Sequence, residues 1–320
     1  MFRVLDVAAS GSAILTEDAG KVAPPPEETI RWIDLDQQDE AQLALLRDRF
    51  GFHPLAIEDC AHFDQRPKLE EYGEYLFLVI HGFTRNGKTA TQLKPIEVHA
   101  FMGPRFLVTV HESPCEALDA AWKRVARDPA LARKGTDFLY YILADAIVDA
   151  NFPILDDIND LLEDIEDAVL GRAERRELPE LFEIKRTLST MRRFLSPQRE
   201  VFAMLAKRGD PRVSERTALY FRDVYDHLVR ISESIDAGRE ILGNALDAYL
   251  TMVSNRTNEV MKRLAIMSAI FLPLTFVTGF FGQNFTHLPF DSDLLMWTAI
   301  FLCLLVPGAM LFWFQKSEWL

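Results

Sequence analysis

Basic residues and cysteines are scarce in this sequence of 320 residues. Lys and Arg number 35 against 48 Asp and Glu, so the formal net charge is -13. This excess of negative charge argues against nucleic acid as a partner and is compatible with cations. The three cysteines, Cys60, Cys115 and Cys303, have neither framework nor metal-ligand spacing, which indicates a reducing compartment.

Several functional signatures are also missing. The start, MFRVLDVAASGSAIL, lacks the continuous apolar stretch of a secretory signal, so we expect membrane insertion to depend on C-terminal segments. The sequence has no phosphate loop, no nucleophile elbow and no His-Glu metal motif. We therefore expect a protein that is not an enzyme.

Two long segments lack charge entirely. Leu264 to Phe281 has 18 uncharged residues and Leu294 to Phe314 has 21, with a tryptophan near each end of the second segment. A helix of 18 residues spans about 27 Å, most of a bilayer core. We expect two transmembrane helices, 264–281 and 294–314. The alternative is a pair of buried core helices, but soluble helices of this length rarely lack every charge.

Basic residues predict the orientation of these helices. Arg256, Lys262 and Arg263 precede the first segment and Lys316 follows the second, whereas the connecting loop, 282–293, carries only two aspartates among charged residues. The positive-inside rule places both ends in the cytoplasm, with a tail at 315–320. We expect a multi-pass protein of the cell (inner) membrane, in contact with lipid.

The soluble part is expected to have three regions. Residues 1–114 are predicted to form an α/β domain, since RWIDLD, YLFLVIHGF, IEVHAFMG and RFLVTVHE favour strands while AQLALLRDRF and HPLAIEDCA favour helices. Residues 115–213 are predicted to be helical, with Pro129, Pro153, Pro197 and Pro211 between helices. Residues 214–263 continue without a stop signal into the first membrane segment, which predicts one stalk helix of nearly seventy residues. Gly238 and Gly243 are its expected weak points.

Three stretches carry a family resemblance. TNEVMKRLAIMSAIFLPLTFVTGFFGQNF with the terminal SEWL, FHPLAIEDCAHFDQRPKLEEYGEYLFLVI, and YFRDVYDH together resemble the CorA family of divalent-cation channels. The resemblance covers nearly the whole chain. It implies a homopentameric, funnel-shaped channel with ten membrane helices and a central pore lined by the first helix of each subunit.

The loop between the membrane segments resembles the Gly-Met-Asn triplet of that family. Gly282, Gln283 and Asn284 stand in its place. Two helices cannot enclose a water-filled pore, so several copies would have to surround it and present a ring of neutral oxygen acceptors that holds hydrated Mg²⁺. Gln283 replaces the family methionine, which leaves the preferred cation open, and His287 is a further candidate for zinc contact. A glycine-asparagine turn is the alternative for the triplet alone.

Spacing suggests which face of the first membrane helix lines the pore. Steps of three or four residues join Asn258, Met261, Ala265, Ser268, Leu272, Thr275 and Gly279. The resemblance implies Asn258, Met261, Leu264, Leu272, Thr275, Gly279 and Asn284 as pore residues. The same positions would also suit ordinary helix packing.

Carboxylates are the expected regulatory ligands. The resemblance implies that Asp59 and Asp247 bind Mg²⁺ between neighbouring subunits, with a second site at Glu58, Asp145 and Asp223. Solvated surface aspartates are the alternative. The helix expected at Leu155 to Leu170 has seven carboxylates and no basic residue, with Ile158, Leu161, Leu162 and Ile165 on its other face.

We therefore expect a channel for Mg²⁺ influx, with Co²⁺ and Ni²⁺ as further cargo, gated by cytoplasmic Mg²⁺. Mg²⁺ would be both the transported and the regulatory ion. A zinc or broad-range transporter of the same fold is one alternative, and a membrane-anchored cation sensor without transport is another.

Overall fold

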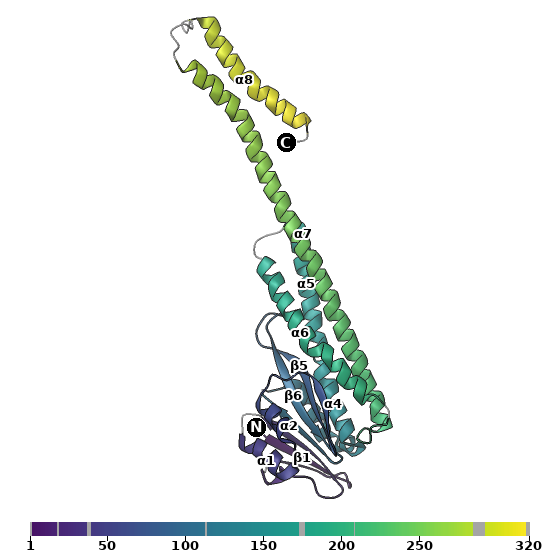
Figure 1. Cartoon of the computed structure of the whole chain (residues 1–320). Coiled ribbons are helices and arrows are strands. Elements are labelled where there is room, and N and C mark those ends of the chain that lie inside the picture. The colour runs from purple at the N-terminus through teal and green to yellow at the C-terminus, as the bar shows by residue number, and fades with distance from the viewer. Residues whose placement is uncertain are drawn as a thin grey trace. The chain divides into compact units, whose positions relative to one another are not determined.

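The computed structural model describes residues 2–17, 19–36, 40–112, 114–172, 177–207, 209–283 and 292–317. The chain forms two compact units. The first unit comprises Met1–Ala168 and Glu174–Leu246, and the second comprises Val169–Ala173 and Asp247–Leu320. Figure 1 shows the sheet and most helices in the first unit and α8 in the second.

A seven-stranded sheet organises the first unit. Its strands are β1 (Phe2–Ala8), β2 (Ala13–Thr16), β3 (Thr29–Asp36), β4 (Lys68–Tyr72), β5 (Tyr75–Arg85), β6 (Leu93–Met102) and β7 (Phe106–His111), in the order β2-β1-β3-β7-β6-β5-β4. Strands β3 and β7 pair in parallel, and every other pair is antiparallel. The buried central strands are rich in β-branched and aromatic residues, which fit a pleated surface covered on both sides.

Helices cover both faces of this sheet. Phe77 and Val79 of β5 share a core cluster with α1 (Glu40–Phe50) and α2 (Pro54–Ala61). Alternate residues face the opposite layer, which is built from α3 (Glu116–Arg127) and α4 (Thr136–Asp149). Gly82 meets Ile147 of α4 there, and Trp32 of β3 lies 4.8 Å from Trp122 of α3 between ring centroids. Short 3-10 helices, Ala19–Lys21 and Pro129–Lys134, complete the connections.

Three long helices follow, α5 (Phe152–Arg172), α6 (Glu177–Leu205) and α7 (Glu215–Phe281). On the acidic helix α5, Ile158, Leu162 and Ile165 are buried while the carboxylates lie at exposed or half-exposed positions, so its predicted two-faced character is confirmed. The prediction of one long helix running into the first membrane segment is also confirmed, since α7 has 67 residues.

Gly238 has a packing role that the sequence did not reveal. A Cβ atom added there would lie 3.3 Å from Leu162 of α5 and 3.4 Å from Leu188 of α6. Glycine therefore lets three helices approach closely at this level of the first unit. Gly243, in contrast, has nothing within 4 Å of such an atom.

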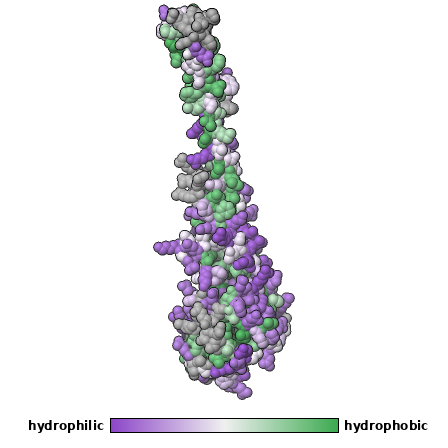
Figure 2. All heavy atoms as spheres, turned by 60° about the vertical axis from the view of Figure 1, so that its left-hand side comes forward, coloured by the Kyte–Doolittle hydropathy of each residue, from purple (hydrophilic) through white to green (hydrophobic). Residues whose placement is uncertain are grey.

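The second unit contains the apolar end of α7 and the helix α8 (Asp293–Lys316). Both helices are long and apolar enough to cross a membrane, and their most apolar windows are only 6% and 0% buried. Leu272, Leu294 and Leu304 are each more than 70% exposed. Figure 2 shows hydrophobic colouring gathered over this unit and hydrophilic colouring over the sheet-bearing unit. In a third apolar stretch, Thr136–Val169, the most apolar window is 61% buried, which is typical of the core of a folded domain.

The structure corrects several expectations. All four expected strands and both expected helices are present, the strands at 31–36, 75–83, 96–103 and 105–112. The sequence did not predict β1, β2 and β4. Strand β4 reads KLEEY and β2 is short and largely exposed, so neither shows a buried alternating pattern. Pro153 and Pro197 were expected between helices, but Pro153 is the second residue of α5 and Pro197 lies inside α6.

Gly238 and Gly243 of α7 are expected to respond oppositely to substitution. Gly243→Ala should raise the unfolding free energy by up to about 1 kcal/mol, because alanine favours a helix and meets open space. Gly238→Leu should lower it by about 1–3 kcal/mol through overpacking against Leu162 and Leu188. Chemical unfolding of the full chain in detergent, followed by circular dichroism, measures both changes. A shift of the same sign in both variants would contradict the close approach at Gly238.

Candidate metal-binding site and pore face

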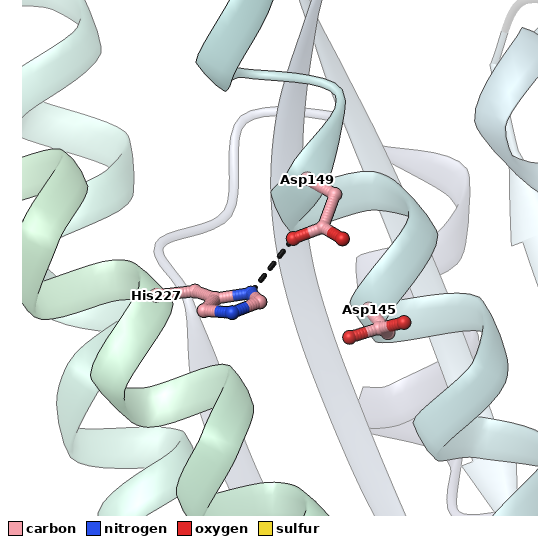
Figure 3. Close-up of side chains that lie close together, drawn as sticks. All are labelled: Asp145, Asp149 and His227. Atoms are coloured by element: carbon pink, nitrogen blue, oxygen red, sulfur yellow. Dashed lines mark hydrogen bonds and ion pairs between the residues drawn. The ribbon is translucent and has the colours of Figure 1, made fainter.

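Two carboxylates and one imidazole converge in the first unit (Figure 3). Asp145 and Asp149 lie one turn apart on α4, and His227 lies on α7. One ligand atom from each lies within 4.8 Å of the other two, and His227 Nδ1 is 2.7 Å from an Asp149 carboxylate oxygen. Within the described ranges, no other group of three such side chains satisfies this geometry. We refer to these three residues as the Asp-Asp-His group.

Negative charge accumulates at this group. Asp145 is partly buried, and burial together with the neighbouring charges of Asp149 and Asp223 raises the pKa of its carboxyl, although His227 and Arg124 oppose the shift. The pKa of Tyr141, one turn earlier on α4, is raised to about 12 by burial and by the charges of Asp145 and Asp223. A cation placed among these carboxylates would relieve their repulsion.

The donor set suits a divalent cation. Carboxylate oxygens are ligands for Mg²⁺, which also retains several waters, whereas imidazole nitrogen suits Co²⁺, Ni²⁺ and Zn²⁺. Ligand atoms within 4.8 Å of one another can surround one ion directly or through its water shell. The site can therefore hold Mg²⁺ and offers one ligand that favours a transition metal.

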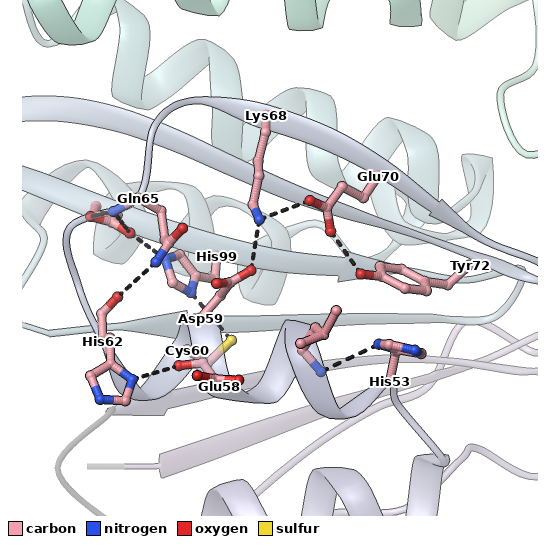
Figure 4. A network of polar contacts seen from close by, with 12 residues as sticks. His53, Glu58, Asp59, Cys60, His62, Gln65, Lys68, Glu70, Tyr72 and His99 are labelled. Carbon is pink, nitrogen blue, oxygen red and sulfur yellow. Dashed lines mark hydrogen bonds and ion pairs between the residues drawn. The ribbon is translucent and has the colours of Figure 1, made fainter.

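The second group of expected ligands lies on α2, on the other side of the sheet. Lys68 Nζ of β4 donates to Asp59 at 2.7 Å and to Glu70 at 2.8 Å (Figure 4). Burial opposes the charge on Lys68, but its hydrogen bonds to Asp59 and Glu70 outweigh this and raise its pKa. Asp59 is therefore already paired with a cation, which it shares with Glu70, while the neighbouring Glu58 is exposed.

A buried thiol fixes α2 to the sheet. Cys60 Sγ lies 3.2 Å from His99 Nδ1, and His99 Nε2 lies 2.5 Å from a carboxylate oxygen of Glu97. Burial, with the nearby charges of Asp59 and Glu97, raises the pKa of the Cys60 thiol. Cys60 is therefore a structural residue and not a reactive one.

The structure assembles only part of the expected ligand sets. Asp145 and Asp223 lie close enough to influence one another electrostatically. Glu58 lies on α2, which packs on the opposite face of the sheet from α4, so the subunit does not bring it to Asp145. Asp59 belongs to the first unit and the exposed Asp247 to the second.

Sequence reasoning missed Asp149 and His227. A signal was present, because Asp145 and Asp149 are four residues apart, as are Asp223 and His227, and this spacing places each pair on one helix face. The sequence could not show that this face of α4 lies against this face of α7.

The expected pore residues lie on one helix. Asn258, Met261, Leu264, Leu272, Thr275 and Gly279 all belong to α7 and are exposed, as are Gly282 and Gln283 just beyond it. The Thr275 hydroxyl donates to the Phe271 carbonyl at 2.8 Å, which satisfies its hydrogen within the helix. Exposure alone does not separate a pore face from a lipid face, since Phe276 is 72% exposed as well. Asn284 and His287 lie outside the described residues.

Comparisons with known proteins agree with this architecture. Residues 27–316 match the family described as CorA-like Mg²⁺ transporter protein. The chain is 35% identical over 290 residues to YfjQ of Bacillus subtilis, a protein named for metal ion transport, covering 90% of this chain and 89% of that one. It is 36% identical over 276 residues to the cobalt/magnesium transport protein CorA of Thermotoga maritima, covering 85% of this chain and 78% of that one.

A solved structure extends the agreement to the fold. The complete structure of the CorA magnesium transporter from Methanocaldococcus jannaschii matches with a TM-score of 0.85 at 19% identity, covering 100% of this chain and 99% of that one. The predicted fold class, an α/β domain followed by a long helix and C-terminal apolar helices, is thereby confirmed. With the family match spanning most of its length, the chain belongs to the CorA-like Mg²⁺ transporter family.

Proposed function

We propose that this protein assembles as a homopentamer in the inner membrane, with both termini cytoplasmic, and admits Mg²⁺ under the control of cytoplasmic Mg²⁺. One observation carries the proposal. A single helix, α7, bears His227 of the Asp-Asp-His group near its start and the uncharged segment 264–281 at its end. A cation bound at the Asp-Asp-His group would therefore contact the same helix, α7, that enters the membrane.

Conduction needs several copies of α7. One apolar helix beside α8 cannot surround water, so the face from Asn258 to Gly279 would line a pore only when repeated around an axis. Met261, Leu264 and Leu272 would then form apolar constrictions that block ions by dewetting. Gly282, Gln283 and Asn284 would supply neutral oxygens at the mouth, which suits a hydrated Mg²⁺ ion that gives up water reluctantly.

Ion preference has two candidate answers. The Thermotoga maritima relative is named for cobalt and magnesium, and the imidazole of His227 suits Co²⁺, Ni²⁺ and Zn²⁺. We assign Mg²⁺ as the main cargo, with a zinc or broad-range transporter as the alternative. A cation sensor without transport would keep the Asp-Asp-His group and show no flux.

Regulation would use differential binding. A cation at the Asp-Asp-His group, or between Asp59 and Asp247 of neighbouring subunits, shifts the channel toward the closed state only if the closed state binds it more tightly. Asp59 is held by Lys68, so Mg²⁺ binding at Asp59 competes with an ion pair inside the subunit.

Asn284→Ala is expected to abolish divalent flux while the oligomer remains assembled, because the mouth loses its amide oxygens. Asn244→Ala, the same change at an exposed position of the first unit, is the matched control and should conduct normally. Dye-reported Mg²⁺ entry into proteoliposomes, with Co²⁺, Ni²⁺ and Zn²⁺ as competitors, measures flux and preference. No flux from the parent would favour the sensor, and parent-like flux from Asn284→Ala would remove the mouth assignment.

Asp145→Asn is expected to raise the melting temperature in EDTA at neutral pH. The folded-state pKa of Asp145 is raised, so its ionisation opposes folding. Relative to the variant, the parent should lose stability as the pH rises from the ordinary pKa of Asp through this raised value. Added Mg²⁺ or Co²⁺ should stabilise the parent more than the variant. Asp167→Asn, on the exposed face of α5, serves as the control, and equal cation stabilisation of all three proteins would exclude binding at Asp145.

Gating offers a test with two opposite directions. Asp59→Asn combined with Asp247→Asn should conduct at millimolar internal Mg²⁺ where the parent is closed, because both carboxylates are lost. Lys68→Met should close at lower Mg²⁺ than the parent, because it frees Asp59. Patch recording at stepped internal Mg²⁺ measures both. Parent-like inhibition of the double variant would place regulation elsewhere, with Glu58, Asp145 and Asp223 as the next candidates.

A further inference from the structure

A hollow between α6 and α7 in the first unit concentrates positive charge. It has a volume of about 470 Å³, and its lining includes Arg192, Arg193, Arg199 and Arg239 with a single carboxylate, Asp236. The whole chain has a formal net charge of -13, so a hollow lined by four arginines and one carboxylate has the opposite sign of charge to the chain as a whole. We call this hollow the arginine groove.

One aspartate organises two of these arginines. Arg192 Nε lies 3.0 Å from Oδ1 of Asp236, and Arg239 Nη1 lies 3.5 Å from the same oxygen. Each guanidinium has five N–H donors, so one shared carboxylate oxygen leaves most of them unused by this contact. The arrangement brings two cations together across the groove and neutralises only one.

The other two arginines rest on aromatic rings. The guanidinium carbon of Arg193 lies 4.6 Å from the Phe194 ring centroid, and that of Arg199 lies 6.0 Å from the Tyr225 ring centroid. Among the residues described in the structure, no carboxylate pairs with Arg193 or Arg199. Ring contacts orient a guanidinium without neutralising it, so both remain available to an anion.

Hydroxyl groups lie between the arginines on both walls. Ser189 and Ser196 come from α6 and Ser232 from α7, and the Ser196 and Ser232 oxygens are 3.5 Å apart. Ser232 is only 4% exposed, so it lies at the floor where the helices touch. Guanidinium and hydroxyl donors around a concave site form the usual environment of a bound phosphate group.

A second hollow continues along the same two helices. Its volume is about 590 Å³. It is lined by Ala203 of α6, by Ala206 and Lys207 just beyond that helix, and by Arg222, Tyr225 and Asp226 of α7. Arg199, which lines the arginine groove, lies over Tyr225, which lines this neighbour. The arginine groove therefore adjoins a hollow that combines small apolar side chains and an aromatic ring with two further cations and one carboxylate.

We propose that the arginine groove binds the polyphosphate group of a nucleoside triphosphate, with the base and sugar toward the second hollow. Four arginines and three serines match a multiply charged anion with many acceptor oxygens. An acidic helix from another protein copy is less suited, because its carboxylates would be spread along a surface, whereas the donors here gather around one hollow, with Ser232 at its floor. Nucleoside triphosphates themselves bind Mg²⁺, so the site would let the protein bind the cell's main Mg²⁺-binding anions.

The test measures binding of radiolabelled ATP to the full chain in detergent by equilibrium dialysis at fixed free Mg²⁺. Arg193→Gln combined with Arg199→Gln leaves the Asp236 ion pairs intact and should weaken binding at least tenfold. Arg186→Gln, an exposed position of α6 that does not line the groove, should stay within twofold of the parent. Inorganic tripolyphosphate should displace the label, but more weakly than unlabelled ATP, and adenosine alone should not.

Three results would overturn the proposal. The first is no binding of ATP by the parent at millimolar concentration, and the second is equal binding by the double variant. The third is a change in oligomer size in the double variant with unaltered ATP binding, which would assign the groove to contact between copies. Dialysis does not depend on ion flux, so the outcome is separate from that of the proposed transport.

Discussion

The continuity of α7 is the constraint on which the rest of the protein depends. A helix satisfies its backbone hydrogen bonds internally, so one element can pass from a charged aqueous unit into an uncharged segment without leaving polar groups unpaired. The same 67 residues bear His227, the close-packed Gly238 and the expected pore face. The helix therefore joins the candidate ligand His227 directly to the uncharged segment through one continuous backbone.

Charge balance distinguishes the two sets of candidate ligands. Asp59 already has a cation, Lys68, at 2.7 Å, whereas burial and the charges of Asp149 and Asp223 outweigh His227 and Arg124 at Asp145 and raise its pKa. A cation arriving at Asp145 relieves repulsion that exists in the folded subunit, and one arriving at Asp59 has to compete with an existing partner. The two positions should differ in affinity even though both offer the same functional group.

Much of the fold could be predicted from local patterns, but little of the site geometry could. The uncharged segments and the unbroken apolar stripe predicted the long helix, and dense β-branched and aromatic runs predicted the central strands. KLEEY gave no such signal, because it lacks a buried alternating pattern and its pairing with β5 is visible only in the structure. Asp149, His227 and Lys68 acquire their roles only when distant segments meet. Gly238 was expected to weaken a helix, and it permits close packing instead.

The parallel pairing of β3 with β7 has a consequence for biosynthesis. Arg31 pairs with Phe106 in register, so the N-terminal β1–β3 part of the sheet cannot join β5 and β6 until the intervening chain has left the ribosome. All strands, and both helices of the Asp-Asp-His group up to His227, are made before the first uncharged segment at Leu264. Domains generally fold as units during synthesis. The sheet-bearing unit can therefore begin to fold before the first uncharged segment has been synthesised, so that membrane insertion would follow a substantially formed first unit.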